Sequence, residues 1–218
     1  MALAIDAVSS AGGSASSFSW AHTCAGSDRV LLLGISWYDT IDTISSVTYN
    51  SVAMTLVPSS SKSIGQYTTV LYYLVAPATG SNTVAVTFTN AVFDFGGGAV
   101  SFTGADQSTP LGTANTASGT STTPSVAITS TTGEIVLDTL IITHSGTLTV
   151  DGSQTQRWNS TGGGFTKYAG STEDGASTTT MSWSNSTSQD WAITGVPVKP
   201  VAVAGSSVRQ LCLTGVGT

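Results

Sequence analysis

The fold is decided by two stretches that follow the same order, Ser27-Asp-Arg-Val-Leu-Leu-Leu33 and Thr132-Gly-Glu-Ile-Val-Leu-Asp138. Each begins with turn residues and continues as a short apolar run, which predicts a buried strand. The correspondence continues further along the chain, where Asn82-Thr-Val-Ala-Val-Thr-Phe88 is matched by Thr178-Thr-Thr-Met-Ser-Trp183. The sequence therefore predicts two pseudo-repeated halves, with the boundary between them in residues 106–124.

Strands are predicted along the whole chain, because segments rich in Val, Ile, Thr and aromatic residues alternate with turn residues and no long amphipathic helical pattern occurs. This pattern predicts an all-β protein, an antiparallel β-sandwich of jelly-roll type whose halves complete one domain over residues 1–200. Two independent sandwiches of similar size are the alternative. The predicted strands are residues 29–38, 46–57, 67–76, 82–89, 97–103, 125–129, 134–143, 155–158, 165–171, 178–184 and 191–198.

Charge is scarce in this chain. Only 8% of its 218 residues are charged, whereas about 25% is usual. The net charge of −6 with six cations leaves no basic stripe, so we expect no nucleic-acid partner. The longest apolar run is far shorter than the roughly 20 residues that cross a bilayer, so we expect no membrane insertion. A hydrophobic content of 40% indicates a folded chain rather than a disordered one.

Both ends of the chain carry alternating apolar residues outside the repeated pattern. Leu3 and Ile5 alternate near the N-terminus, and Val208, Leu211 and Leu213 lie in a C-terminal segment, residues 201–218. An extended segment of this kind can pair with an exposed sheet edge of a neighbouring subunit. These residues are therefore candidate assembly arms; the alternative is that each segment pairs back onto its own sheet.

Known catalytic motifs are missing from the sequence. It contains no G-x-S-x-G nucleophile elbow, no H-E-x-x-H and no paired C-x-x-C. An acidic hydrolase would need two carboxylates, for which Glu134 and Glu173 are the only glutamates. Both adjoin predicted turns, where acidic residues commonly have structural roles. We therefore expect a non-enzymatic protein.

One tryptophan is the best candidate for contact with a ligand. Trp158 stands beside Arg157 and shortly before the Gly162-Gly-Gly164 loop, so its ring is expected to be exposed and able to stack on a glycan. Trp158 and Arg157 are the predicted ligand-binding residues.

Calcium is a weaker expectation, because sandwich loops can assemble carboxylate and carbonyl ligands. The candidate ligands are two pairs of acidic residues, Asp39 with Asp42 and Glu173 with Asp174. Neither pair has the fixed spacing of a calcium loop. No other cofactor is expected.

Two longer stretches carry a family resemblance. Tyr72-Tyr73-Leu-Val-Ala-Pro-Ala-Thr-Gly-Ser-Asn-Thr-Val-Ala-Val-Thr-Phe88 and Val100-Ser-Phe-Thr-Gly-Ala-Asp-Gln-Ser-Thr-Pro110 resemble Ser/Thr/Gly-rich β-sandwich modules of bacteriophage structural proteins and bacterial extracellular proteins. The resemblance implies a self-associating virion subunit, as in a capsid, decoration or tail component, whose partners are further copies or other proteins of the assembly. The alternative is a glycan-binding or adhesion module that is extracellular or on a cell surface.

Overall fold

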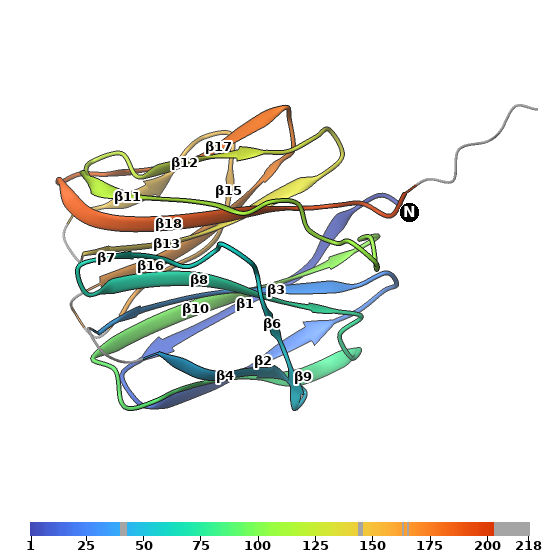
Figure 1. The fold of residues 1–218 in the computed structure, drawn as a ribbon, viewed down its shortest axis with the longest axis horizontal. Coiled ribbons are helices and arrows are strands. Elements are labelled where there is room, and N and C mark those ends of the chain that lie inside the picture. The colour runs from blue at the N-terminus through green and yellow to red at the C-terminus, as the bar shows by residue number, and fades with distance from the viewer. Residues whose placement is uncertain (40–42, 144–145, 163, 165, 203–218) are drawn as a thin grey trace, which may run out of the picture.

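The computed structural model describes residues 1–39, 43–143, 146–162, 164 and 166–202. These residues form eighteen strands, all paired antiparallel, and no helix (Figure 1). The prediction of an all-β antiparallel sandwich is confirmed. Its jelly-roll form is not, because the strands build a stack of four layers in which two sandwiches lie face to face (Figure 1).

The first half of the chain forms two of these layers. An inner sheet has the order β1-β10-β3-β8-β6, with β7 also on β8, and an outer sheet has the order β2-β9-β4-β5. The strands are β1 (Ala4–Gly13), β2 (Ser17–Cys24), β3 (Val30–Tyr38), β4 (Ile44–Tyr49), β5 (Val52–Ala53), β6 (Thr55–Leu56), β7 (Lys62–Ile64), β8 (Tyr67–Val75), β9 (Gly80–Phe88) and β10 (Asp94–Thr103).

The second half repeats this order. Its inner sheet is β11-β18-β13-β16-β15 and its outer sheet is β12-β17-β14, so β18, β13 and β16 correspond to β10, β3 and β8. The connection between the halves overlaps the predicted boundary; the limits of the domain itself stay a prediction. The strands are β11 (Asn115–Ser121), β12 (Ser125–Thr129), β13 (Ile135–Thr143), β14 (Leu148–Val150), β15 (Thr155–Thr161), β16 (Thr166–Asp174), β17 (Thr178–Asn185) and β18 (Gln189–Val198).

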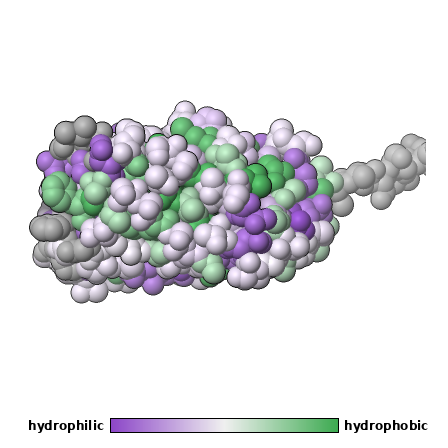
Figure 2. All heavy atoms as spheres, turned by 90° about the horizontal axis from the view of Figure 1, so that it is seen from below, coloured by the Kyte–Doolittle hydropathy of each residue, from purple (hydrophilic) through white to green (hydrophobic). Residues whose placement is uncertain are grey.

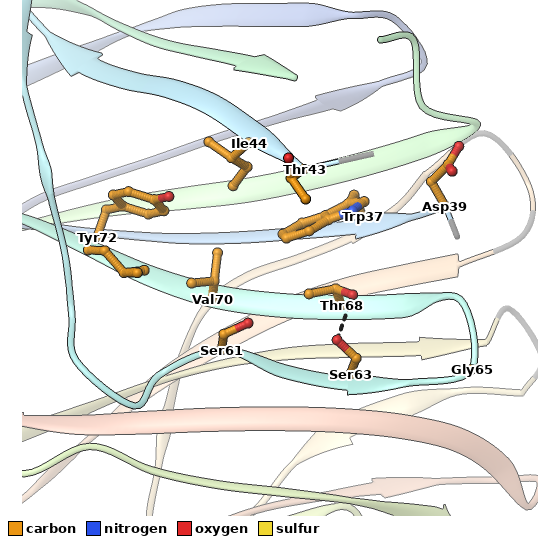
Figure 3. A pocket seen from close by; sticks show the side chains of 11 residues that line it. Trp37, Asp39, Thr43, Ile44, Ser61, Ser63, Gly65, Thr68, Val70 and Tyr72 are labelled. Carbon is orange, nitrogen blue, oxygen red and sulfur yellow. Dashed lines mark hydrogen bonds between the residues drawn. The ribbon is translucent and has the colours of Figure 1, made fainter. Parts of the chain in front are cut away.

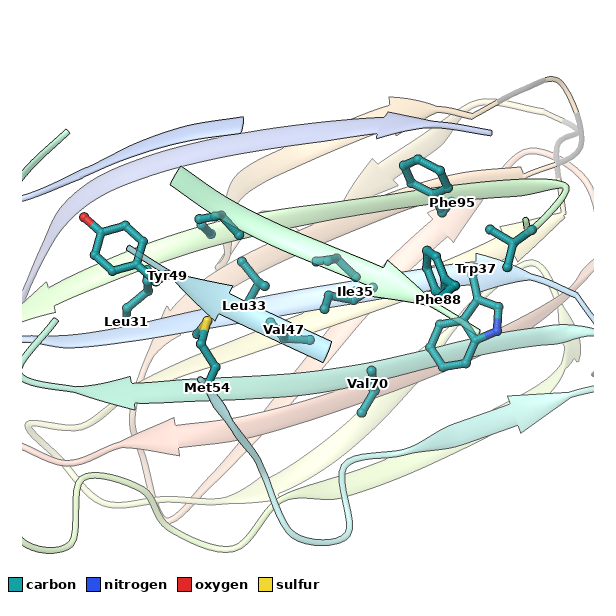
Figure 4. Close-up of a cluster of buried hydrophobic side chains, with 14 of the residues drawn as sticks. Leu31, Leu33, Ile35, Trp37, Val47, Tyr49, Met54, Val70, Phe88 and Phe95 are labelled. Atoms are coloured by element: carbon teal, nitrogen blue, oxygen red, sulfur yellow. The ribbon is translucent and has the colours of Figure 1, made fainter. Parts of the chain in front are cut away.

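Strand β3 is buried on both faces, which explains its uninterrupted apolar sequence. Leu31 and Leu33 point into the core of the first sandwich, whereas Val30 and Leu32 point into the core between the halves. Figure 4 shows the first of these cores, closed by Tyr49 and other residues of the outer sheet. The chain thus has three apolar layers, and β13 has the equivalent central position in the second half.

Three glycines shape the core between the halves around Trp158 of β15. A Cβ at Gly98 would lie 2.3 Å from the Trp158 ring, one at Gly170 2.1 Å, and one at Gly34 3.0 Å. The indole is only 4% exposed. Gly98 and Gly170 are therefore glycine because the Trp158 ring occupies the space of a side chain, and at Gly34 the Thr139 side chain, 2.7 Å from such a Cβ, leaves still less room.

Residues 46–57, predicted as one strand, form three. Tyr49 pairs with Val52 across a two-residue turn, and Asn50 and Ser51 both have positive φ, 49° and 63°. A turn with two positive φ values matches the twist of a tight hairpin. The chain then leaves the outer sheet, and β6 pairs with β8 in the inner one.

Candidate functional site

The two outer sheets contain no charged residue. None of their seven strands, β2, β4, β5, β9, β12, β14 and β17, has an Asp, Glu, Lys or Arg in its sequence. The shortage of charge is therefore concentrated on the two opposite faces of the molecule, and the inner sheets and the loops carry the charged residues.

The solvent side of each outer sheet is a set of rows of small side chains. In the first half, Ser19 pairs with Ala85 and Ala85 with Thr48; in the second, Ala127 pairs with Thr180. Figure 2 views the molecule from the side of the first outer sheet, and much of that surface is pale, neither strongly hydrophilic nor strongly hydrophobic. The outward residues are Ser17, Ser19, Ala21, Thr23, Ser46, Thr48, Ser81, Thr83, Ala85 and Thr87 in the first half, and Ser125, Ala127, Thr129, Thr149, Thr178, Thr180, Ser182 and Ser184 in the second.

A groove of about 370 Å³ lies at the open edge of the first sandwich, between β4 and the strands β6, β7 and β8 (Figure 3). We call it the edge groove. Its apolar lining includes Trp37, which is 7% exposed, and the half-buried Tyr72, whose pKa is raised by desolvation. Its volume is within the range of small-ligand sites, about 300–1,000 Å³. The lining residues are Trp37, Asp39, Thr43, Ile44, Leu56, Ser61, Ser63, Gly65, Thr68, Val70 and Tyr72.

Trp158 is not an exposed stacking platform, so that expectation is wrong. The ring is buried between the two halves because Gly34 and Gly98 of the first half leave room for it. Arg157 is half-buried on the other face of β15, where its Nε donates to Thr172 Oγ1 at 2.8 Å, and burial lowers its pKa. The two predicted ligand-binding residues therefore point to different places.

The calcium candidates are not brought together into a site. Across the described part of the chain, no three His, Cys, Asp or Glu side chains lie close enough to hold a metal ion. Glu173 and Asp174 line a small cavity with Arg157, while Asp39 lies at the edge groove in the other half. Asp42 lies outside the described residues.

The N-terminal segment belongs to the chain's own fold. Ile5 pairs with Phe102 in β10, and Leu3 packs on the core between the halves, so within this chain the segment follows the alternative of pairing back onto its own sheet, and its exchange between copies stays a prediction. The described C-terminal residues Pro200 and Val201 lie beside this segment, where both line a cavity of about 710 Å³ with Leu3. The other predicted arm residues, Val208, Leu211 and Leu213, lie outside the described residues.

Each half has a buried ionisable side chain, and burial shifts the pKa values of the two in opposite directions. Asp138 of β13 is fully buried, and desolvation raises its pKa to about 7. It accepts hydrogen bonds from Ser171 N, Ser171 Oγ and Trp183 Nε1 at 2.5, 2.9 and 2.7 Å. In the first half, desolvation lowers the pKa of His22 to about 4, with Asp6 opposing the shift. These groups hold sheets together and lie away from the edge groove.

The sequence did not indicate the aromatic cluster of Tyr38, Tyr67 and Phe93 or the edge groove. Tyr38 stacks on Tyr67 at 5.0 Å between ring centroids and contacts Phe93 at 5.8 Å, and Phe93 is 67% exposed. The only local signal is that each of these aromatic residues lies at a strand end or in a loop, where exposure is common.

Comparison with known proteins finds no matching family model, no matching curated protein and no matching solved structure. Within the described residues, no helix has the length and apolar character needed to cross a membrane.

Proposed function

We propose that this protein is a non-enzymatic structural subunit of a virus particle or a similar assembly, and that copies associate through the uncharged outer faces. The main observation in support is that all seven strands of the outer sheets lack charged residues. The resemblance expected from the sequence, to Ser/Thr/Gly-rich β-sandwich modules of bacteriophage structural proteins and bacterial extracellular proteins, is compatible with this function; the proposed location is the virion, and the alternative is a glycan-binding or adhesion module that is extracellular or on a cell surface.

Association through these faces is favourable because little free energy is lost when they are buried against another copy. Fixing an Ala side chain costs no rotamer entropy, while fixing a Lys or Glu costs up to about 2 kcal/mol. Like charges brought together across an interface cost several kcal/mol, and these faces present none. Because the two faces lie on opposite sides of the molecule (Figure 1), contacts between them can extend from copy to copy in a non-closing series.

The test is the association state of the full chain over a range of concentrations, measured by light scattering and electron microscopy. We expect oligomers or particles for the natural sequence. Thr83→Arg with Thr180→Arg places one guanidinium on each outer face and should shift the equilibrium to the monomer. Ser108→Arg, an exposed position in the connection between the halves, is the matched control and should leave association unchanged. A natural chain that stays monomeric under all conditions contradicts the proposal.

A further inference from the structure

The edge groove is a hollow with an apolar wall and a rim of hydroxyl groups, and the proposed association through the outer faces does not use it. We propose that the edge groove binds one or two units of an uncharged saccharide. The proposal does not depend on the proposed structural function, because it uses the sandwich edge and not the outer faces.

The inner surface of the groove suits the apolar face of a sugar ring. Figure 3 shows Trp37, Val70 and Tyr72 side by side along β3 and β8, with Ile44 opposite them. Trp37 and Val70 are buried and fixed by the core of the first sandwich, so they form a preorganised wall. Tyr72 is half-buried, so part of its ring is available for stacking on the C–H groups of a pyranose.

The rim suits the hydroxyl groups of the same ligand. Thr43, Ser61, Ser63 and Thr68 line the groove, and each hydroxyl can both donate and accept a hydrogen bond. Ser63 Oγ and Thr68 Oγ1 lie 2.9 Å apart on neighbouring strands, so they form a ready polar pair. A sugar ring, with one apolar face and a polar edge, matches this separation of apolar wall and hydroxyl rim.

The lining residues disfavour anionic ligands, and the hydrogen bonds of β8 disfavour a peptide added as a strand. Among the described residues that line the groove, Asp39 is the only charged one and none is Lys or Arg, so these residues offer no positive charge to a phosphate, sulfate or carboxylate. A peptide added as a strand would need free backbone groups on β8. At Leu71 these groups are already used: its N–H donates to Ser60 Oγ at 3.2 Å, and its carbonyl accepts from Val57 N at 2.9 Å.

The experiment titrates the full chain with uncharged tetrasaccharides of glucose, galactose, mannose and N-acetylglucosamine, followed by calorimetry and by NMR. At least one should bind. Ser63→Trp fills the groove from its rim without removing a core side chain, and should abolish binding. Tyr72→Ala should weaken it about two- to tenfold, the effect of one lost ring contact. Ser177→Trp, at an exposed position between β16 and β17 of the second half, is the matched control and should bind like the natural chain.

Thermal unfolding shows which variants are folded. If Tyr72→Ala does not fold, Ser63→Trp alone tests whether the groove is the binding site. Binding of none of the four sugars, or equal binding by the natural chain and Ser63→Trp, overturns the proposal. Tighter binding of a sulfated sugar or an extended peptide at the same groove also overturns it. The Thr83→Arg/Thr180→Arg variant should bind the sugar with unchanged affinity whatever its association state, so the two proposals fail separately.

Discussion

Asp138→Asn should change how the stability of the protein depends on pH. The carboxyl is fully buried and its pKa rises from 3.8 to about 7 because desolvation outweighs its hydrogen bonds to Trp183 and Ser171. Between these two pKa values, the folded state binds a proton that the unfolded state has released. The free energy of unfolding therefore falls as pH rises from 4 to 7. At about 1.4 kcal/mol per pH unit, this contribution falls by about 4 kcal/mol in all.

Urea unfolding followed by tryptophan fluorescence from pH 4 to pH 8 measures this dependence. The natural chain minus Asp138→Asn should give a difference curve that falls by about 4 kcal/mol up to pH 7 and is flat above it. The amide has a donor where Trp183 Nε1 needs an acceptor, which adds a pH-independent cost of about 1–3 kcal/mol. Asp106→Asn is the control of opposite sign, because hydrogen bonds from Thr109 N and Ser108 N lower the pKa of this exposed group. Parallel curves for the natural chain and Asp138→Asn would refute the reasoning.

Three further changes test the packing and its electrostatics. His22→Gln should remove a pH dependence: in the natural chain the free energy of unfolding falls by about 3 kcal/mol as pH falls from 6.5 to 4, because burial lowers the histidine pKa to about 4 and only the unfolded state binds the proton in this range. A difference curve, natural chain minus variant, that does not rise from pH 4 to pH 6.5 contradicts it. Trp158→Ala should destabilise the fold by about 3–5 kcal/mol in urea unfolding, and a loss under 1 kcal/mol would mean that the ring is not a core residue. Gly98→Ala should cost about 1–3 kcal/mol, because its Cβ would lie 2.3 Å from the Trp158 ring. Gly152→Ala meets no atom within 4 Å and is the control, so equal melting temperatures for the two alanine variants would refute the steric argument.

The apolar strands could be predicted because a strand that is buried on both faces has an uninterrupted apolar sequence. Residues 29–38 and 134–143 were predicted as strands and form β3 and β13, the centres of the two inner sheets. The repeat order was also visible, since each half begins its central strand with the same turn and apolar run. Strands such as β2 and β11 were missed because every second residue is Ser, Thr, Ala or Gly, a composition that resembles a loop.

The candidate sites were less accessible to sequence reasoning. Trp158 has polar neighbours and a glycine loop after it, which indicates exposure, but its burial depends on Gly34 and Gly98, more than fifty residues earlier in the chain. The edge groove joins Ile44 to Tyr72 across two different sheets, so no local pattern reports it. The uncharged outer faces could be predicted only in part. The sequence shows that charged residues are few, but the sheet order is needed to show that they are missing from two opposite faces.

Cross-linking between outer faces tests self-association most directly. In a Cys212→Ser background, Thr83→Cys and Thr180→Cys together place one exposed thiol on each outer face, while the natural Cys24 is buried and free. Treatment with a short bis-maleimide should give a ladder of covalent multimers at concentrations where a control with two exposed thiols outside the strands of the outer sheets, Ser108→Cys with Ser177→Cys, gives none. A chain that remains monomeric on the gel, or a ladder of the same intensity from the control, would contradict association through the outer faces.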